Sequence, residues 1–218
     1  MPTTIFKLFG FLNRLSFIDR WALMFSTRKE NVKEHSFDVS VIAHTLAVVA
    51  NTYFSGAYNP AKAVMYSVFH DASEAITGDM PTPVKYFSTE VKSAADKVET
   101  IAIQKMVSCL PVEMRDEYSK VFHIPCEYKS LVKAADRIAA LAKCLEEKKR
   151  GNDEFVRAEL RIREVLEETR QDMPEVGYFL DHFLPGFNCS LDQLCEGNGS
   201  WIIDGDAESP VSLLIHNP

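Results

Sequence analysis

The stretch EYKSLVKAADRIAALAKCLEEKKRGN, residues 127–152, is the clearest indicator of the fold. Its apolar residues recur at helical spacing and form one stripe, made of Leu131, Ala135, Ile138, Ala142 and Leu145. Gly151 supplies a stop signal directly after this pattern. Asp136 lies beside the stripe, so the predicted helix carries a carboxylate next to its buried face.

The remaining chain also has helical periodicity, and strand-like alternation is almost absent. A second apolar stripe occurs at residues 36–54 and consists of Val39, Ile42, Ala43, Leu46 and Val49, with His35 at the start of that helix. Further helices are predicted at residues 4–15, 61–77, 90–109, 113–122, 153–170 and 174–184. A rigid loop with two prolines is predicted at residues 79–87. The fold class is therefore predicted to be all-α.

The length and composition indicate one globular domain. A chain of 218 residues with 46% hydrophobic residues can bury a substantial core without disulfides or structural metals. Residues 1–195 are predicted to form this domain. Residues 196–218 shift towards Gly, Ser, Asp and Asn around two apolar runs, so we predict an appendage there, a small hairpin or a packed tail.

The net charge and the cysteines limit the kinds of binding partner and the cellular compartment that fit this sequence. A net charge of -7 argues against a nucleic-acid polymer as partner, although a small anionic substrate remains compatible with local positive groups. The five cysteines include no C-x-x-C pair, which predicts reduced thiols. The N-terminal stretch lacks a basic leader, and no window approaches the roughly 18 apolar residues of a membrane span. We therefore expect a cytoplasmic protein that contacts no membrane.

Four residues of metal-ligand type stand out in the order H…HD…D: His35, the adjacent pair His70 and Asp71, and Asp136. Two imidazoles and two carboxylates suit Mn, Co, Fe, Ni or Zn better than Ca or Mg. Side chains from facing helices can hold such an ion in the core of a bundle. Each residue also has a simpler interpretation, for example His70 as a core histidine or Asp136 as an ion-pair partner of a neighbouring base.

Two carboxylates near the HD pair are candidates for proton transfer. Glu74 lies four residues after His70, where it can hold or deprotonate a water next to the metal, or else face solvent. Asp79 opens the proline-containing loop, from which a carboxylate can reach a sugar or protonate a leaving oxygen.

Arg20 and Trp21 are candidates for substrate binding. The planar fork of an arginine can grip a phosphate, and an adjacent indole offers a flat wall to a base or a deoxyribose. The alternative is a core tryptophan next to a surface arginine. Lys85 adds a further candidate cation for the phosphate.

Five segments resemble the YfbR-like 5′-deoxynucleotidases of the HD-domain superfamily: DRWALM, ENVKEHS, FHDASEAITGDMPTPVKYF, SLVKAADRIAALAKCLEEKKRGNDEF and FLPGFNCSLDQL. The similarity runs from about residue 11 to residue 194. It implies a homodimeric, all-helical HD-domain bundle with a single metal site in the core. It also implies removal of the 5′-phosphate from deoxyribonucleoside monophosphates, with one divalent transition metal ion such as Co²⁺, Mn²⁺ or Zn²⁺.

The resemblance assigns a role to each candidate position. Metal binding falls to His35, His70, Asp71 and Asp136, three of which (His35, Asp71 and Asp136) would also contact substrate. Arg20 would orient the phosphate, and Glu74 would serve the attacking water. The nucleotide pocket would be lined by Trp21, Asp79, Met80, Pro81 and Thr82.

Two other functions remain compatible with these motifs. A phage-type or bacterial HD triphosphohydrolase would take dATP or other deoxynucleoside triphosphates and release triphosphate, with the same metal and sugar wall. A degenerate HD module would bind a nucleotide only as a signal, although it would have no need of an intact ligand set together with Glu74. The chain departs from the family pattern after Cys195 and at Met80, where leucine is more typical.

Overall fold

The computed structural model describes residues 4–195, and its regular structure is helical. Within these residues no β-strand occurs, and strand-like pairing is limited to an isolated antiparallel bridge between Asp19 and Asn31. The prediction of an all-α fold is confirmed. The predicted appendage at residues 196–218 lies outside the described residues.

The helices have the following bounds. They are α1 Leu8–Arg14, α2 Val32–Tyr53, α3 Pro60–Val68, α4 Glu74–Thr77, α5 Thr82–Lys85, α6 Thr89–Ser108, α7 Val112–Val121, α8 Cys126–Lys149, α9 Val156–Asp172, α10 Pro174–His182 and α11 Leu191–Cys195. Short 3₁₀ turns cover Leu15–Phe17, Asp153–Phe155 and Leu184–Asn188. Within residues 4–195 no helix is both long and apolar enough to cross a membrane.

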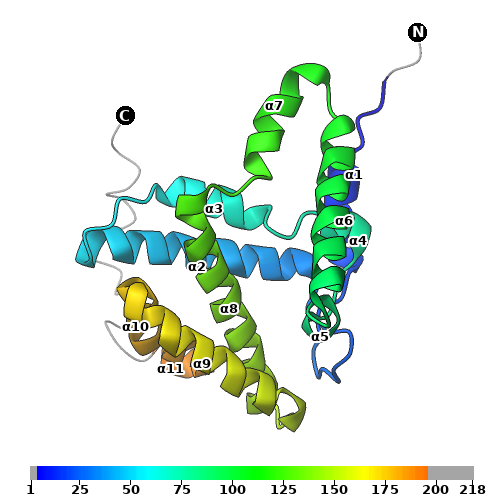
Figure 1. The fold of residues 1–218 in the computed structure, drawn as a ribbon. Helices are drawn as coiled ribbons and strands as arrows, with labels where there is room; N and C mark the ends of the chain where they lie inside the picture. Colours follow the sequence, from blue (N-terminus) through cyan, green and yellow to red (C-terminus); the bar gives the residue numbers. More distant parts are fainter. Residues whose placement is uncertain (1–3, 196–218) are drawn as a thin grey trace, which may run out of the picture.

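The main core lies where α8 crosses α2, with α3 along one side of α2, α9 packed against α8, and α10 packed against α9 and α2 (Figure 1). The two predicted stripes meet here: every residue of the α2 stripe is buried, and on α8 Leu131, Ala135, Ile138 and Leu145 are buried while Ala142 is half-buried. Each fully buried Leu or Ile contributes about 1.5–3 kcal/mol, so this crossing fixes the two long helices against each other.

A second, smaller core joins α1, α4 and α6 at the other end of the molecule, and it includes Leu8, Met106 and Leu110. The residues between α3 and α4 connect the two cores. Tyr66, just before this connection, belongs to the main core, whereas Ala72 belongs to the smaller one. The HD pair is therefore held at the junction of two packed regions.

The predicted continuous helix at residues 61–77 is wrong. Helix α3 ends at Val68, residues 69–73 form turns, and α4 starts at Glu74. The backbone here uses tighter hydrogen bonds, for example from Ala72 N–H to Phe69 O, and the ring of His70 bonds to Ser67 O at 2.7 Å. A side chain that bonds to the backbone competes with the helical pattern, which residue periodicity does not register.

Smaller differences concern helix ends. Helix α1 starts at Leu8 rather than at residue 4, and the predicted loop at residues 79–87 contains the four-residue α5. Helix α2 starts at Val32 because Asn31 caps it, its side-chain oxygen accepting from the N–H of Glu34 at 2.9 Å. His35 thus lies within the first turn of α2.

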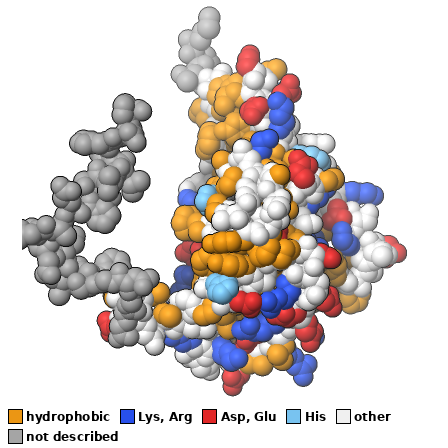
Figure 2. Space-filling view, turned by 90° about the vertical axis from the view of Figure 1, so that its left-hand side faces the viewer, with side chains coloured by type: hydrophobic (Ala, Val, Ile, Leu, Met, Phe, Trp, Pro, Cys, Tyr) orange, Lys and Arg blue, Asp and Glu red, His pale blue; other side chains and the backbone are white. Residues whose placement is uncertain are grey.

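One face of the molecule carries exposed aromatic side chains. Figure 2 shows the side that lies to the left in Figure 1, where hydrophobic side chains gather in a band above a region rich in charges. The end of α2 and helix α10 lie on this side. There Tyr53 stacks on Tyr178 with ring centroids 4.9 Å apart, and Phe54 and Phe183 lie beside Tyr178. We call these four residues the aromatic surface cluster.

Candidate functional site

The four predicted metal ligands come together at the junction of α2, the turn at residues 69–73 and α8. His35, His70 and Asp71 offer ligand atoms that all lie within 4.8 Å of one another. Asp71 Oδ2 is 3.0 Å from His70 Nε2 and 3.8 Å from His35 Nε2. Asp136 joins through His35, with its Oδ1 3.0 Å from His35 Nε2. We call these four residues the ligand cluster.

The hydrogen-bonding pattern of the ligand cluster is compatible with a bound cation. His70 Nδ1 donates to Ser67 O at 2.7 Å, so His70 Nε2 is the ring atom that faces the cluster, and it offers a lone pair to a cation once its proton is lost. Among the described residues, the buried atoms His70 Nε2 and His35 Nδ1 have no well-aligned hydrogen-bond partner. Such atoms cost free energy unless something binds them. Together with two carboxylates, the imidazoles form a donor set of the kind that divalent transition metals prefer.

The charges of the ligand cluster are strongly coupled. Burial opposes charge on His70, but the adjacent Asp71 carboxylate raises the pKa of His70 to about 9. Burial likewise opposes charge on Asp71, but His70, His35 and Arg20 hold its pKa well below the usual range. The metal-free cluster is thus a protonated imidazole against a carboxylate, and a metal ion would displace that proton.

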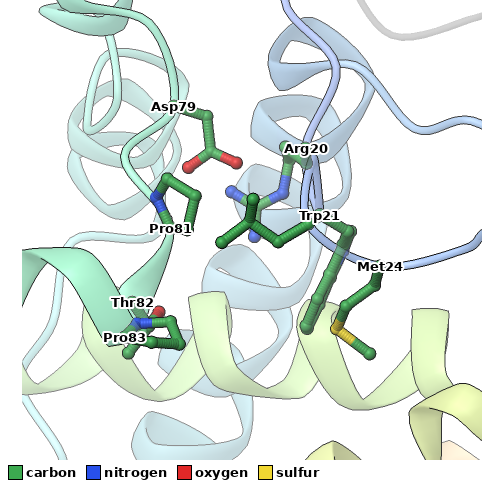
Figure 3. A pocket seen from close by; sticks show the side chains of 8 residues that line it. Arg20, Trp21, Met24, Asp79, Pro81, Thr82 and Pro83 are labelled. Carbon is green, nitrogen blue, oxygen red and sulfur yellow. The ribbon is translucent and has the colours of Figure 1, made fainter.

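A pocket of about 150 Å³ opens next to the ligand cluster, and Figure 3 shows the side chains around it. Its lining contains five predicted site residues and three that sequence reasoning missed: Arg20, Trp21, Asp79, Pro81 and Thr82, with Leu23, Met24 and Pro83. The carboxylate of Asp79 points towards the guanidinium of Arg20 (Figure 3). Arg20 Nη1 also donates to Asp71 Oδ2 at 3.4 Å, which links the pocket directly to the ligand cluster.

Trp21 adopts an unusual backbone conformation. Its φ of 59° lies in the left-handed region, which costs a bulky residue on the order of 1–3 kcal/mol. Its indole packs edge-on against Phe155, with ring centroids 5.2 Å apart. Trp21 is half-buried and the Arg20 side chain is only 13% exposed, so the alternative of a core tryptophan beside a surface arginine does not describe the pair.

Glu30 was missed by sequence reasoning, although it lies in the segment ENVKEHS. This buried carboxylate accepts hydrogen bonds on one oxygen, Oε2, from both Arg20 Nε and Trp21 Nε1, each at 3.1 Å. Its only sequence signal is its place just before the helix cap Asn31, and a glutamate near a helix start is ordinary.

Glu147 was missed as well. It is fully buried on α8 and accepts from the N–H and the hydroxyl of Thr27, both at 2.8 Å, as well as from Asn152 and Lys143. Lys143 in turn donates to Arg28 O at 2.6 Å. These bonds fasten the segment that follows Trp21 to the helix that carries Asp136.

Three predicted site residues belong neither to the ligand cluster nor to this pocket. Glu74, Met80 and Lys85 line an adjoining cavity of about 300 Å³ between the HD segment and α6. There Lys85 Nζ donates to Glu99 Oε1 at 2.7 Å, so its charge is already paired. Met80 and Lys85 line this cavity and not the pocket beside Arg20 and Trp21.

The two candidate proton-transfer groups have raised pKa values. Burial first, then the nearby carboxylates of Asp71 and Asp79, raises the pKa of Glu74 to about 9. Glu74 Oε2 is buried and has no partner among the described residues. Burial also raises the pKa of Asp79, although Arg20 opposes this effect. In the metal-free site Glu74 is therefore protonated at neutral pH, and a positive charge at the ligand cluster would lower its pKa.

Comparison with known proteins points to one family. A family model described as 5′-deoxynucleotidase YfbR-like matches residues 7–187. A 5′-deoxynucleotidase of Shewanella oneidensis is 42% identical over 190 residues, which cover 86% of this chain and 96% of that protein. The 5′-deoxynucleotidase YfbR of Escherichia coli is 43% identical over 191 residues, covering 86% of this chain and 95% of the relative.

Solved structures share the fold. An HD-domain phosphohydrolase from Listeria innocua superimposes with a TM-score of 0.72 at 27% identity, covering 83% of this chain and 88% of that chain. An HD phosphohydrolase of cyanophage S-2L, solved with dA and one catalytic Zn²⁺ ion, gives a TM-score of 0.60 at 19% identity. That match covers 81% of this chain and 96% of the phage protein, and it bears on the fold alone.

Proposed function

Because this chain belongs to the YfbR-like 5′-deoxynucleotidase family of HD-domain proteins, we propose that it hydrolyses deoxyribonucleoside 5′-monophosphates to the deoxynucleoside and phosphate. One observation carries the proposal beyond family membership. Arg20, in the wall of the small pocket, also donates to Asp71 of the ligand cluster at 3.4 Å. A phosphate gripped by Arg20 would therefore lie beside the residues suited to a metal.

We propose that His35, His70, Asp71 and Asp136 hold one divalent transition metal ion, with Co²⁺, Mn²⁺ or Zn²⁺ as candidates. The support is their mixed nitrogen and oxygen donor set and the Nε2 atom of His70, which faces the cluster and has no well-aligned hydrogen-bond partner among the described residues. When bound, such an ion supplies a Lewis acid that lowers the pKa of water and offsets phosphate charge.

The other residues would bind substrate and move protons. Arg20 presents a planar fork to the phosphate and balances its charge as the bond from water oxygen to phosphorus forms. Glu74, ionised when a cation occupies the ligand cluster, would accept the proton of that water. Asp79 would donate a proton to the 5′-oxygen as the phosphorus–oxygen bond breaks, and its raised pKa favours that role.

Trp21 would select deoxyribose over ribose. The pocket, at about 150 Å³, is smaller than the ~300–1,000 Å³ that enclose a drug-sized ligand, so it suits a sugar rather than a whole nucleotide. A 2′-hydroxyl against the apolar indole would lack both room and a hydrogen-bond partner. Pro81 and Thr82 would form part of the opposite wall. Met80 and Lys85 would contact the nucleotide only from the adjoining cavity.

The direct test is hydrolysis by the purified full-length protein, with Co²⁺, Mn²⁺ or Zn²⁺ added separately. We expect orthophosphate from dAMP and other deoxynucleoside monophosphates, and at least ~10-fold slower release from AMP. Incubation with dATP, with orthophosphate resolved from triphosphate, tests the triphosphohydrolase alternative. Release of triphosphate without dAMP hydrolysis would replace our proposal by that alternative, and no hydrolysis with any metal would favour a binding module.

We further propose that the protein is a cytoplasmic homodimer that takes a small-molecule deoxynucleotide and no nucleic-acid polymer. The aromatic surface cluster supports association between copies, because its Tyr53 side chain is 60% exposed and exposed apolar patches often mark interfaces. The five free cysteines fit a reducing compartment. Light scattering at several protein concentrations tests the dimer, and Tyr53→Glu is expected to shift it towards the monomer.

A further inference from the structure

We propose that Glu30 is a positioning residue that sets the sugar selectivity of the pocket by fixing the indole of Trp21 relative to the guanidinium of Arg20. This inference rests on the proposed deoxynucleotidase function. Glu30 itself does not line the pocket, so it would act through the two side chains that do.

Glu30 joins the two side chains at a single atom. Its Oε2 accepts from Arg20 Nε and from Trp21 Nε1, both at 3.1 Å. Its backbone oxygen also accepts from the N–H of Arg20 at 2.8 Å. The carboxylate is only 5% exposed, so little water can replace these bonds. One buried oxygen, Glu30 Oε2, thus sets the distance between the Arg20 guanidinium, which would bind the phosphate, and the Trp21 indole, which would contact the sugar.

Trp21 needs such a restraint. A left-handed backbone at a bulky residue persists only when its surroundings hold it in place. Among the described residues, Phe155 holds the indole by an edge contact, and Glu30 holds the indole N–H by a hydrogen bond. The edge contact lets the ring slide, whereas the hydrogen bond is directional. Loss of Glu30 Oε2 would let the ring move away from the sugar.

A simpler role for Glu30 is to balance the charge of Arg20. Charge balance alone would change phosphate binding equally for deoxyribonucleotides and ribonucleotides, because both carry the same phosphate. Positioning acts on the sugar wall, so it would change the ratio between them. Arg20 has a second carboxylate partner, Asp71, whereas the indole N–H has Glu30 as its acceptor in the described chain. The selectivity ratio therefore separates the two roles.

Two conservative variants separate charge from reach. Glu30→Asp keeps the charge but is one methylene shorter, so it cannot reach both donors. Glu30→Gln keeps the length and a carbonyl oxygen that can accept both bonds, but removes the charge. We expect the ratio of kcat/KM for dAMP over AMP to fall about 10-fold in Glu30→Asp and to stay within about threefold of wild type in Glu30→Gln. Glu159→Gln, at another buried glutamate with two basic partners, is the matched control and should keep the ratio.

A second readout does not depend on turnover. Hydrogen exchange of the Trp21 indole N–H, assigned by comparison with Trp21→Phe, should be faster in Glu30→Asp than in Glu30→Gln or wild type. An unchanged ratio and unchanged indole exchange in Glu30→Asp would overturn the positioning role, as would a larger loss of selectivity in Glu30→Gln. Absence of dAMP hydrolysis by the wild-type protein would instead refute the proposed function, and the indole exchange would still test the hold of Glu30 on Trp21.

Discussion

The ligand cluster and the pocket wall are built in opposite ways. The ligand cluster draws on two long helices and a turn between two cores, and two of its buried nitrogen atoms have no well-aligned hydrogen-bond partner among the described residues. The pocket wall around Arg20 and Trp21 belongs to an irregular segment, which buried carboxylates hold through many hydrogen bonds. Helix packing thus leaves His70 Nε2 facing the ligand cluster without a well-aligned partner, whereas polar bonds fix a loop that packing alone would not hold.

This difference predicts different consequences of mutation. Changes in the ligand cluster should abolish activity, because they remove candidate metal ligands. Changes in the carboxylates behind the pocket wall should destabilise the fold or shift selectivity. Changes in the adjoining cavity should have the smallest effect.

The largest effect is expected for Asp71→Ala. Asp71 contacts His70, His35 and Arg20, so its loss should remove both bound metal and phosphate orientation. We expect kcat/KM for dAMP to fall at least ~10³-fold, with metal content near zero and a normal helical circular dichroism spectrum. Asp96→Ala, at a surface ion pair on α6, is the control and should retain both. Full metal content in Asp71→Ala would contradict its role as a ligand.

A large loss of stability is expected for Glu147→Gln. The change leaves the buried Lys143 with only a longer ion pair, to Glu146 Oε2 at 3.9 Å, and should lower the free energy of unfolding by about 3 kcal/mol at pH 7. Denaturant titration measures this value. Glu146→Gln, at the neighbouring and more exposed position, should cost less than about 1 kcal/mol. Equal losses in the two variants would contradict the role of Glu147 as an anchor.

The same residue predicts a pH dependence. Burial opposes the charge on Glu147, but bonds from Asn152, Lys143 and Thr27 hold its pKa below the ordinary value of 4.5. Stabilisation by its charge is therefore complete well above pH 4.5 and is lost as the pH falls below that value. The stability difference between wild type and Glu147→Gln should shrink from pH 6 to pH 3. A difference that stays constant over this range would show that the charge is not its source.

The smallest effect is expected for Lys85→Met. Its ammonium is paired with Glu99 and lies in the adjoining cavity, away from Arg20. We expect kcat/KM for dAMP to change by less than about threefold, against a loss of about 100-fold in Arg20→Met as the reference. A rise in KM of more than about 10-fold in Lys85→Met would instead show that both Lys85 and Arg20 bind the phosphate.

Much of the fold could be predicted from residue spacing alone. The stripes on α2 and α8 mark the faces that become the core, because a helix repeats its faces regularly. The break between α3 and α4 could not be predicted in this way. It depends on the ring of His70 bonding to the carbonyl of Ser67, and residue periodicity does not register that contact.

The sequence by itself determined the helical class, which follows from residue spacing, and the family, which its five segments resemble. It also indicated His35, His70, Asp71 and Asp136 as candidate metal ligands. The tertiary structure alone decided that Glu30 and Glu147 hold the segment around Trp21 and that Lys85 and Met80 line the adjoining cavity. The physical reason is that these contacts form only in the folded chain, both for partners close in sequence, such as Glu30 and Trp21, and for distant ones. Glu147 accepts a hydrogen bond from Thr27, which lies 120 residues away in the sequence. Whether a buried carboxylate stabilises the fold depends on which donors the folded chain brings to it.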